Sequence, residues 1–211
     1  MRTATALLCA ASLAALFLGG CSTASTGPVV NVNPPYVGRT SPENVLRHVV
    51  TSYVWMNATE YLDCLSEDFE FYPDEADVQD PNLEIPPVWY KTDEQNMHEN
   101  MFDEGSDVES ISLTLTVTSI VYDYGVPEDG LDDTCVCRVD VDLRVNLQVG
   151  VTYLATAPSE FLMRVDTDQQ GAGGERFWEI HMWYDLGSGG RGGDSASGER
   201  TSWGIVKSLY K

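Results

Sequence analysis

The sequence is short of basic residues. Its 211 residues include 12 lysines and arginines against 33 aspartates and glutamates, a formal net charge of −21 at pH 7. Proteins bind nucleic acid largely by neutralising phosphates with lysine and arginine, and they dock on anionic lipid through clusters of the same residues. The charge balance therefore argues against both roles, although acidity by itself selects no particular function.

Motifs that identify an activity are also missing. No Gly-rich phosphate loop follows a strand, and the sequence contains no nucleophile elbow. The acidic stretch PEDGLDD at residues 127–133 lacks the ligand spacing of an EF-hand, so it is interpreted as a solvated hairpin loop. His98 is expected to be a partly buried surface residue, and His48 has no recognisable partner. We predict no metal site and no cofactor.

The uncharged apolar run near the start is too short to span a bilayer. Residues 4–18 form about 15 such positions after Arg2, whereas a spanning helix needs roughly 20. A basic start, an apolar middle and small residues before a cut are typical of a secretory signal peptide. We therefore interpret residues 1–20 as a signal peptide.

The run ends in LFLGGC, and Leu18-Gly19-Gly20-Cys21 looks like the lipobox of bacterial lipoproteins. That resemblance implies a diacylglyceryl group on the Cys21 thiol, cleavage before Cys21 and acylation of the new amino terminus. Several acyl chains, at about 0.8 kcal/mol per buried methylene, hold a domain firmly on a membrane. The alternative is an ordinary signal peptide in which Cys21 is incidental.

The segment after the cysteine is rich in Ser, Thr, Pro and Gly. Residues 21–40 are therefore predicted to be the lipidated cysteine followed by a flexible tether of about 19 residues, with a reach of roughly 25 Å. The predicted location is the bacterial cell envelope. Serine at position 22 indicates the outer membrane, facing the periplasm, if the organism is Gram-negative.

Three helices are predicted at the start of the folded domain, which we assign to residues 41–211. Ser41-Pro42-Glu43 supplies an N-cap, a proline at the first helical position and an early acid. Asn57 with Glu60 resembles a capping box that starts a second, shorter helix, and residues 92–95 cap a third. An acidic, proline-broken loop separates the second and third helices.

Long strands follow the helices. Apolar residues alternate with polar ones through residues 111–118, and every odd position from 135 to 149 is apolar. Such period-two patterns indicate strands with one buried face. Other strands are expected at residues 69–72, 151–165 and 176–185, and residues 201–211 read as an edge strand or a helical turn. The class is α+β: helices packed on a curved, mainly antiparallel sheet.

Several segments together suggest a family. These segments are SPENVL at the start of a helix, YLDCLSEDFEFY, Trp89 ahead of DEQNMHENMF, FWEIHMWYD and TSWGIVKSLYK. Through them the chain resembles bacterial lipoproteins with a nuclear-transport-factor-2-like (cystatin-like, SnoaL-like) domain. The resemblance covers residues 41–210. It implies a cone-like half-barrel with three helices over its open side, often with an internal pocket. Isomerases of this fold need a carboxylate base just after the first strand, and neither Tyr72 nor Asp74 falls cleanly there.

The segment FWEIHMWYD supplies the candidate pocket. Simple alternation puts two sets of side chains on opposite faces: Glu179, His181, Trp183 and Asp185 on one, and Trp178, Ile180, Met182 and Tyr184 on the other. If the first set lines the cone, the histidine between carboxylates acts as a proton shuttle or holds a polar ligand. The alternative is that this face is solvated and the aromatic set fills the core.

Three cysteines lie in the folded domain. Cys135 and Cys137 are two apart on a strand and point in parallel, which disfavours a bond between them. Cys64 pairing with either Cys135 or Cys137 is one alternative in a compartment that permits disulfides. Three buried apolar thiols are the other.

The hypothesis from sequence is a lipid-anchored cell-envelope protein without catalytic activity. It would bind a small apolar or amphipathic ligand in its pocket, or a protein partner on the sheet. The sequence also leaves open whether the protein forms a homodimer through the sheet. The alternative function is a small enzyme of the isomerase, cyclase or hydratase kind that uses a pocket around His181.

The anchor is testable directly. Cys21→Ser removes the thiol that carries the diacylglyceryl group, so we expect metabolic labelling with a radioactive fatty acid to be lost and the precursor to stay uncut by the lipoprotein peptidase. Labelling that persists in Cys21→Ser would refute the anchor.

Overall fold

A seven-stranded sheet forms the framework of the computed structural model, which describes residues 35–122, 134–171, 173–187 and 199–210. Its strand order is β2-β1-β6-β5-β4-β3, with β7 beside β5. Neighbouring strands are antiparallel except for the pairs β1/β6 and β5/β7. The strands are β1 (Leu65–Tyr72), β2 (Trp89–Tyr90), β3 (Val108–Tyr122), β4 (Thr134–Leu147), β5 (Thr152–Gln170), β6 (Arg176–Asp185) and β7 (Glu199–Thr201).

The first two helices begin where the sequence predicts. In α1 (Pro42–Val54) the Ser41 side chain accepts a hydrogen bond from the backbone N–H of Asn44, and in α2 (Ala58–Leu62) the Asn57 side chain accepts one from Glu60. Each bond satisfies a donor that the first turn of a helix leaves unpaired. Both N-terminal predictions are confirmed.

The other helices differ in detail from the prediction. The third predicted helix, α4 (Lys91–Phe102), starts slightly early, because the carboxylate of Asp93 reaches back 2.9 Å to the backbone N–H of Tyr90. The short α3 (Glu75–Val78) lies in the predicted acidic loop. Of the two alternatives for the last segment the helix is observed, as α5 (Trp203–Ser208). The α+β class is confirmed, and α3 is a short helix that the sequence did not predict. No helix among the described residues is long and apolar enough to cross a membrane.

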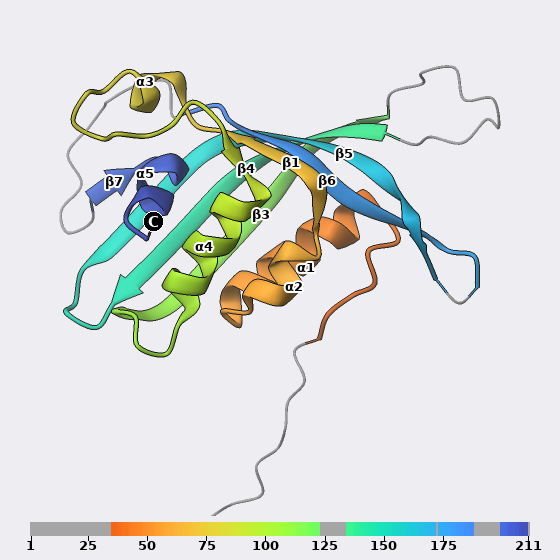
Figure 1. Cartoon of the computed structure of the whole chain (residues 1–211), viewed down its shortest axis with the longest axis horizontal. Coiled ribbons are helices and arrows are strands. Elements are labelled where there is room, and N and C mark those ends of the chain that lie inside the picture. The colour runs from red at the N-terminus through yellow and green to blue at the C-terminus, as the bar shows by residue number, and fades with distance from the viewer. Residues whose placement is uncertain (1–34, 123–133, 172, 188–198, 211) are drawn as a thin grey trace, which may run out of the picture. The chain divides into compact units, whose positions relative to one another are not determined.

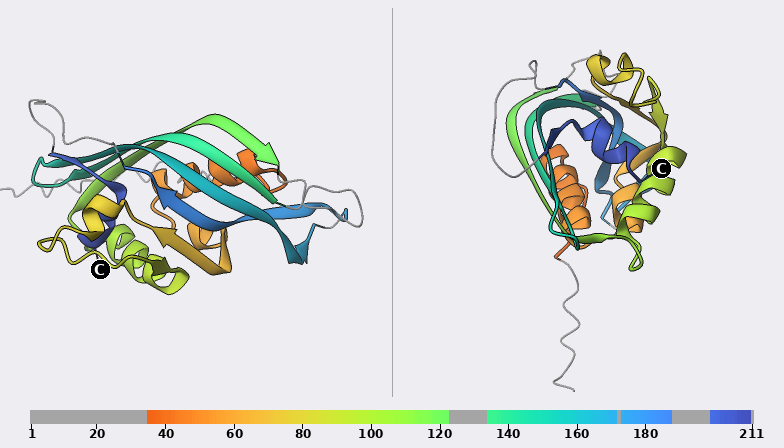
Figure 2. Two further views of the ribbon diagram at one scale, coloured as in Figure 1. Left: turned by 90° about the horizontal axis from the view of Figure 1, so that it is seen from above. Right: turned by 90° about the vertical axis from the view of Figure 1, so that its left-hand side faces the viewer.

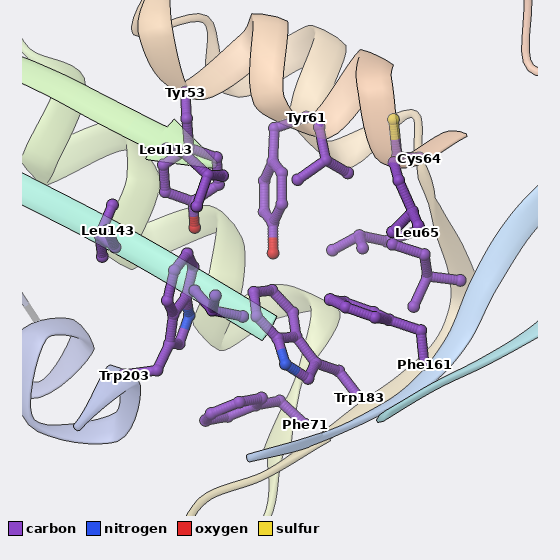
Figure 3. Packing of buried hydrophobic residues seen from close by; sticks show 14 of the residues in the cluster. Tyr53, Tyr61, Cys64, Leu65, Phe71, Leu113, Leu143, Phe161, Trp183 and Trp203 are labelled. Atoms are coloured by element: carbon purple, nitrogen blue, oxygen red, sulfur yellow. The ribbon is translucent and has the colours of Figure 1, made fainter. Parts of the chain in front are cut away.

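The sheet curves, and α1, α2, α4 and α5 lie on its concave side (Figures 1 and 2). The alternation in β4 explains which side chains fill that concave side: odd-numbered positions from Cys135 to Leu147 are buried, whereas even-numbered ones are half-buried or exposed. They meet the inward faces of α1 and α4, which supply Val49, Tyr53 and Met97. Aromatic rings occupy the middle of this core (Figure 3).

Phe161 on β5 is fully buried in that core. We expect Phe161→Ala to lower the free energy of unfolding by about 3–5 kcal/mol, because the deletion removes buried area and leaves a cavity. Val121→Ala on β3, where the side chain is 61% exposed, should change it by less than about 0.5 kcal/mol. Urea unfolding, monitored by tryptophan fluorescence, measures the free energy of unfolding of both variants. Similar decreases in the two variants would show that this core does not stabilise the fold.

Candidate functional site

A β-bulge separates the four residues predicted to share one face of β6. Leu162 of β5 pairs with Met182, and the next residue, Met163, pairs with Ile180, so His181 is an extra residue on β6. An extra residue reverses the alternation beyond it. As a result Trp183 and Asp185 are buried on the core side, while Glu179 and His181 belong to a cluster of charges with Arg164 and Asp68. The single-face expectation is therefore wrong.

Glu179 and His181 are brought together through Arg164 and Asp68. The guanidinium of Arg164 donates to both Asp68 oxygens, at 2.6 and 3.2 Å, and to Glu179 at 2.9 Å. His181 Nδ1 lies 3.4 Å from Asp68 Oδ1. Burial alone would raise the pKa of Asp68, but hydrogen bonds from Arg164 and Ser66 outweigh it and bring the pKa to about 2. The cluster links β1, β5 and β6 by ion pairs.

This cluster does not have the geometry of a nucleophile activated by a base. Ser66 Oγ and Asp68 both approach the same histidine nitrogen, Nδ1, at 3.5 and 3.4 Å. A serine–histidine–aspartate arrangement needs the hydroxyl and the carboxylate on different nitrogens of the ring. The Asp68 carboxylate is in addition engaged by Arg164, so its charge serves the ion pair.

Trp183 and Asp185 face the core and have quite different surroundings. The Trp183 ring centroid lies 4.6 Å from that of Phe161 and 4.7 Å from that of Trp203. Asp185 is 5% exposed and accepts a hydrogen bond from the backbone N–H of Gly187. Burial, opposed by that hydrogen bond and assisted by two nearby aspartates, raises the pKa of Asp185 to about 6.

The structure also contains a buried polar network that the sequence reading missed. Glu94 on α4 is fully buried, and its carboxylate accepts hydrogen bonds from the Tyr61 hydroxyl at 2.8 Å and from the Lys207 ammonium. His98, one turn along α4, is also fully buried and contacts the Tyr53 hydroxyl at 2.5 Å. The expectation that His98 lies near the surface is therefore wrong.

A signal for this network was present in the sequence. Glu94, Met97, His98 and Met101 follow the i, i+3, i+4, i+7 spacing that puts side chains on one face of a helix. The two methionines mark that face as buried. Glu94 and His98 were passed over because they are polar, although their spacing places them inward.

The tautomer of His98 follows from its two contacts. Nδ1 lies 2.8 Å from the backbone carbonyl of Glu94, which can only accept, so Nδ1 carries the proton. Nε2 then accepts from the Tyr53 hydroxyl. Burial, reinforced by the positive charge of Lys207, lowers the pKa of His98 well below 6.5. The imidazole is thus neutral in the folded protein.

His48 has partners too, contrary to expectation. Its Nε2 lies 2.8 Å from Glu60 Oε2, its Nδ1 lies 3.0 Å from the carbonyl of Val37, and its ring stacks on Tyr36 at 4.6 Å. Farther along, the carbonyl of Arg39 accepts from the backbone N–H of Trp178 at 2.7 Å. Residues 36–39, which the sequence reading placed in the tether, therefore pack against the domain.

Cys64, Cys135 and Cys137 are free, buried thiols, so the alternative of a disulfide between Cys64 and Cys135 or Cys137 is not observed. The Sγ atoms of Cys135 and Cys137 are 3.8 Å apart. Burial raises the pKa of Cys64 to about 12, which keeps the thiol protonated and unreactive. The alternative of three buried thiols is the one observed. Cys21 lies outside the described residues.

The surface of the described chain includes a polar cleft and an apolar one. The polar cleft, of about 480 Å³, includes Glu179, Arg39, Lys91 and Arg164 in its lining. Its cations are engaged: Lys91 binds Glu67 at 2.8 Å, and Arg39 donates to Gln169 at 3.1 Å. The other is an apolar groove of about 700 Å³ between α1 and β3. Within the described part of the chain, no group of His, Cys, Asp or Glu side chains is arranged to hold a metal ion.

Comparison with known proteins finds neither a matching family model nor a match among curated proteins. Solved structures do match. One is a ketosteroid isomerase-like protein from Erwinia carotovora atroseptica, with 13% identity and a TM-score of 0.44, covering 67% of this chain and 89% of that one.

Two other solved structures are similar to the same degree. A nuclear-transport-factor-2-like superfamily protein from Salmonella enterica has 15% identity and a TM-score of 0.46, covering 70% of this chain and 89% of its own. A domain of unknown function with a cystatin-like fold from Nostoc punctiforme has 12% identity and a TM-score of 0.44, covering 70% and 75%. Structural neighbours thus include nuclear-transport-factor-2-like and cystatin-like proteins.

The neutral state of His98 predicts a pH dependence. The unfolded chain takes up a proton on this histidine near pH 6.5, whereas the folded chain resists it, so its contribution to stability is present above that pH and is lost as the pH falls. We expect His98→Gln to cost about 1–2 kcal/mol more at pH 7 than at pH 5 in urea unfolding. A cost that is equal at the two pH values would contradict a buried neutral imidazole.

Proposed function

We propose that the chain is a lipid-anchored protein of the bacterial cell envelope whose domain binds a small amphipathic molecule, without catalysis, in the groove between α1 and β3. The observation that carries this proposal is the groove itself. Its volume of about 700 Å³ lies within the range of roughly 300–1,000 Å³ typical of small-molecule sites.

The walls of the groove are aliphatic. Leu46 and Val50 of α1 form one side, and Leu113, Leu115 and Val117 of β3 form the other. Val117 is 40% exposed, so the groove presents apolar surface to solvent. A flexible acyl chain suits such a lining, since each methylene it buries contributes about 0.8 kcal/mol.

The rim provides a counterpart for a polar head group. Arg47 lines the groove, and within the described part of the chain its guanidinium forms no salt bridge. A guanidinium matches a carboxylate with two parallel hydrogen bonds. Because Glu43, one turn from Arg47, also lines the groove and the protein is strongly acidic, the affinity must come mainly from burial of the tail. The occupant we propose is a single acyl chain with a carboxylate head.

The surroundings of the titratable groups favour binding over catalysis. His181 lines neither the polar cleft beside Arg164 nor the apolar groove, and its neighbour Asp68 is engaged by Arg164. Glu94, His98 and Lys207 are buried and bonded within their own network. An enzyme built around His181 would need that histidine to line a cavity.

The test uses the chain from Ser22 onward, exported without its lipid, and the fluorescent fatty acid cis-parinaric acid. We expect Val117→Asp to weaken its binding by at least about tenfold, because a carboxylate in the groove opposes both the tail and the head. Val121→Asp on the same strand is the matched control. Its side chain is 61% exposed and lies outside the groove, so binding should be unchanged.

The head group is tested separately with the methyl ester of the same probe. Arg47→Met should weaken binding of the acid by about two- to fivefold while leaving the ester unaffected, since a surface charge pair contributes up to about 1 kcal/mol. If Val117→Asp and Val121→Asp bind the acid equally well, the groove is not the site. A native mass spectrum of the purified chain then shows whether another small molecule has co-purified.

A further inference from the structure

A second site, separate from the groove, lies inside the curve of the sheet around Lys207. This side chain is 2% exposed, and its ammonium lies 3.7 Å from the ring centroid of Phe71 and 4.5 Å from that of Trp183. A carboxylate oxygen of Glu94 accepts its hydrogen bond. Aromatic faces and a carboxylate around a desolvated ammonium are the features by which proteins recognise organic cations.

Most of this cage is independent of α5. Phe71 belongs to β1, Trp183 to β6 and Glu94 to α4. The second Glu94 oxygen accepts from the Tyr61 hydroxyl at 2.8 Å, so the carboxylate stays oriented without Lys207. The rings of Phe71, Trp183 and Tyr61 gather around one region of the interior (Figure 3). The site is thus preorganised for an ammonium group.

An indole donor on β6 points to a further requirement of a ligand. Trp183 Nε1 is buried and has no acceptor among the described residues. Leaving a buried donor unpaired costs about 1–3 kcal/mol. An oxygen acceptor placed near the ammonium of a ligand could accept from Trp183.

The present occupant of the cage is carried on the short helix α5. α5 has six residues and follows the three-residue strand β7. A helix of that length is not stable alone in water, so it depends on the burial of Trp203, Val206 and Lys207. Loss of Lys207 alone would leave the buried carboxylate of Glu94 without a charge partner, which is strongly destabilising. Exchange of Lys207 for another ammonium restores that partner, so it leaves no unpaired charge in the interior.

We propose that this cage binds small primary alkylammonium compounds that carry an oxygen acceptor, such as amino alcohols, and that Lys207 occupies it as a built-in substitute for the ligand. Binding of the amine displaces Lys207 and, with it, α5. No covalent step is involved. The site takes a cation, whereas the groove takes an acyl carboxylate, so the two proposals fail independently.

Lys207→Ala tests the recognition, because n-propylammonium has the shape of the atoms removed. We expect n-propylammonium chloride to raise the melting temperature of Lys207→Ala by about 2–4 °C, relative to sodium chloride at equal ionic strength and pH. The neutral 1-propanol should give no such rise. Lys91→Ala, which removes a lysine that binds Glu67 outside the cage, is the control variant and should not respond to the amine.

The unmodified chain tests the displacement and does not depend on how the variant folds. We expect a large excess of ethanolamine to increase amide hydrogen exchange of residues 203–208, followed by mass spectrometry, without increasing it in β4. Selective rescue of Lys207→Ala together with faster exchange in α5 supports the proposal. Equal rescue by 1-propanol, or exchange in α5 that ethanolamine does not change, overturns it.

Discussion

The ion pair between Glu94 and Lys207 is the interaction on which the interior depends. A fully buried carboxylate is tolerated only when its charge and its hydrogen-bonding capacity are both met. Lys207 from α5 balances the charge of Glu94, and Tyr61 from α2 donates the second hydrogen bond to its carboxylate. One turn along α4, the contact between His98 and Tyr53 connects α4 to α1. Four helices thus share one polar centre beneath the sheet, and α5 is coupled to all of them.

The bulge at His181 decides which charges stay out of that centre. If β6 alternated regularly, without a bulge at His181, Glu179 and Asp185 would lie on the same face of the strand. With it, Glu179 is bound by Arg164 in the cluster with Asp68, and Trp183 turns inward to form part of the wall around Lys207. The bulge therefore places Glu179 in a cluster of ion pairs on one face of the sheet and Trp183 in the aromatic interior around Lys207 on the other.

Much of the fold could be predicted from the sequence, because its signals are local. The alternation through β4 and the caps at Ser41 and Asn57 each depend on a few neighbouring residues. The site could not be predicted in the same way. A bulge is set by the pairing partner, here Leu162 and Met163 of a distant strand, and alternation along β6 alone gives no sign of it. Likewise, the partner of Glu94 is more than a hundred residues away.

The acidity of the chain acts differently on the two sites. A net charge of −21 attracts cations over long range and repels anions. An alkylammonium is therefore drawn towards the cage, and Glu94 supplies the short-range part of its binding. A carboxylate approaching Arg47 is opposed by the same field, so its affinity rests on the apolar contact that its tail makes with Leu115 and Val117. The scarcity of basic residues that argues against nucleic-acid binding thus also affects the two sites differently. Charge is the main attraction at the cage around Lys207, whereas hydrophobic burial is the main attraction at the groove.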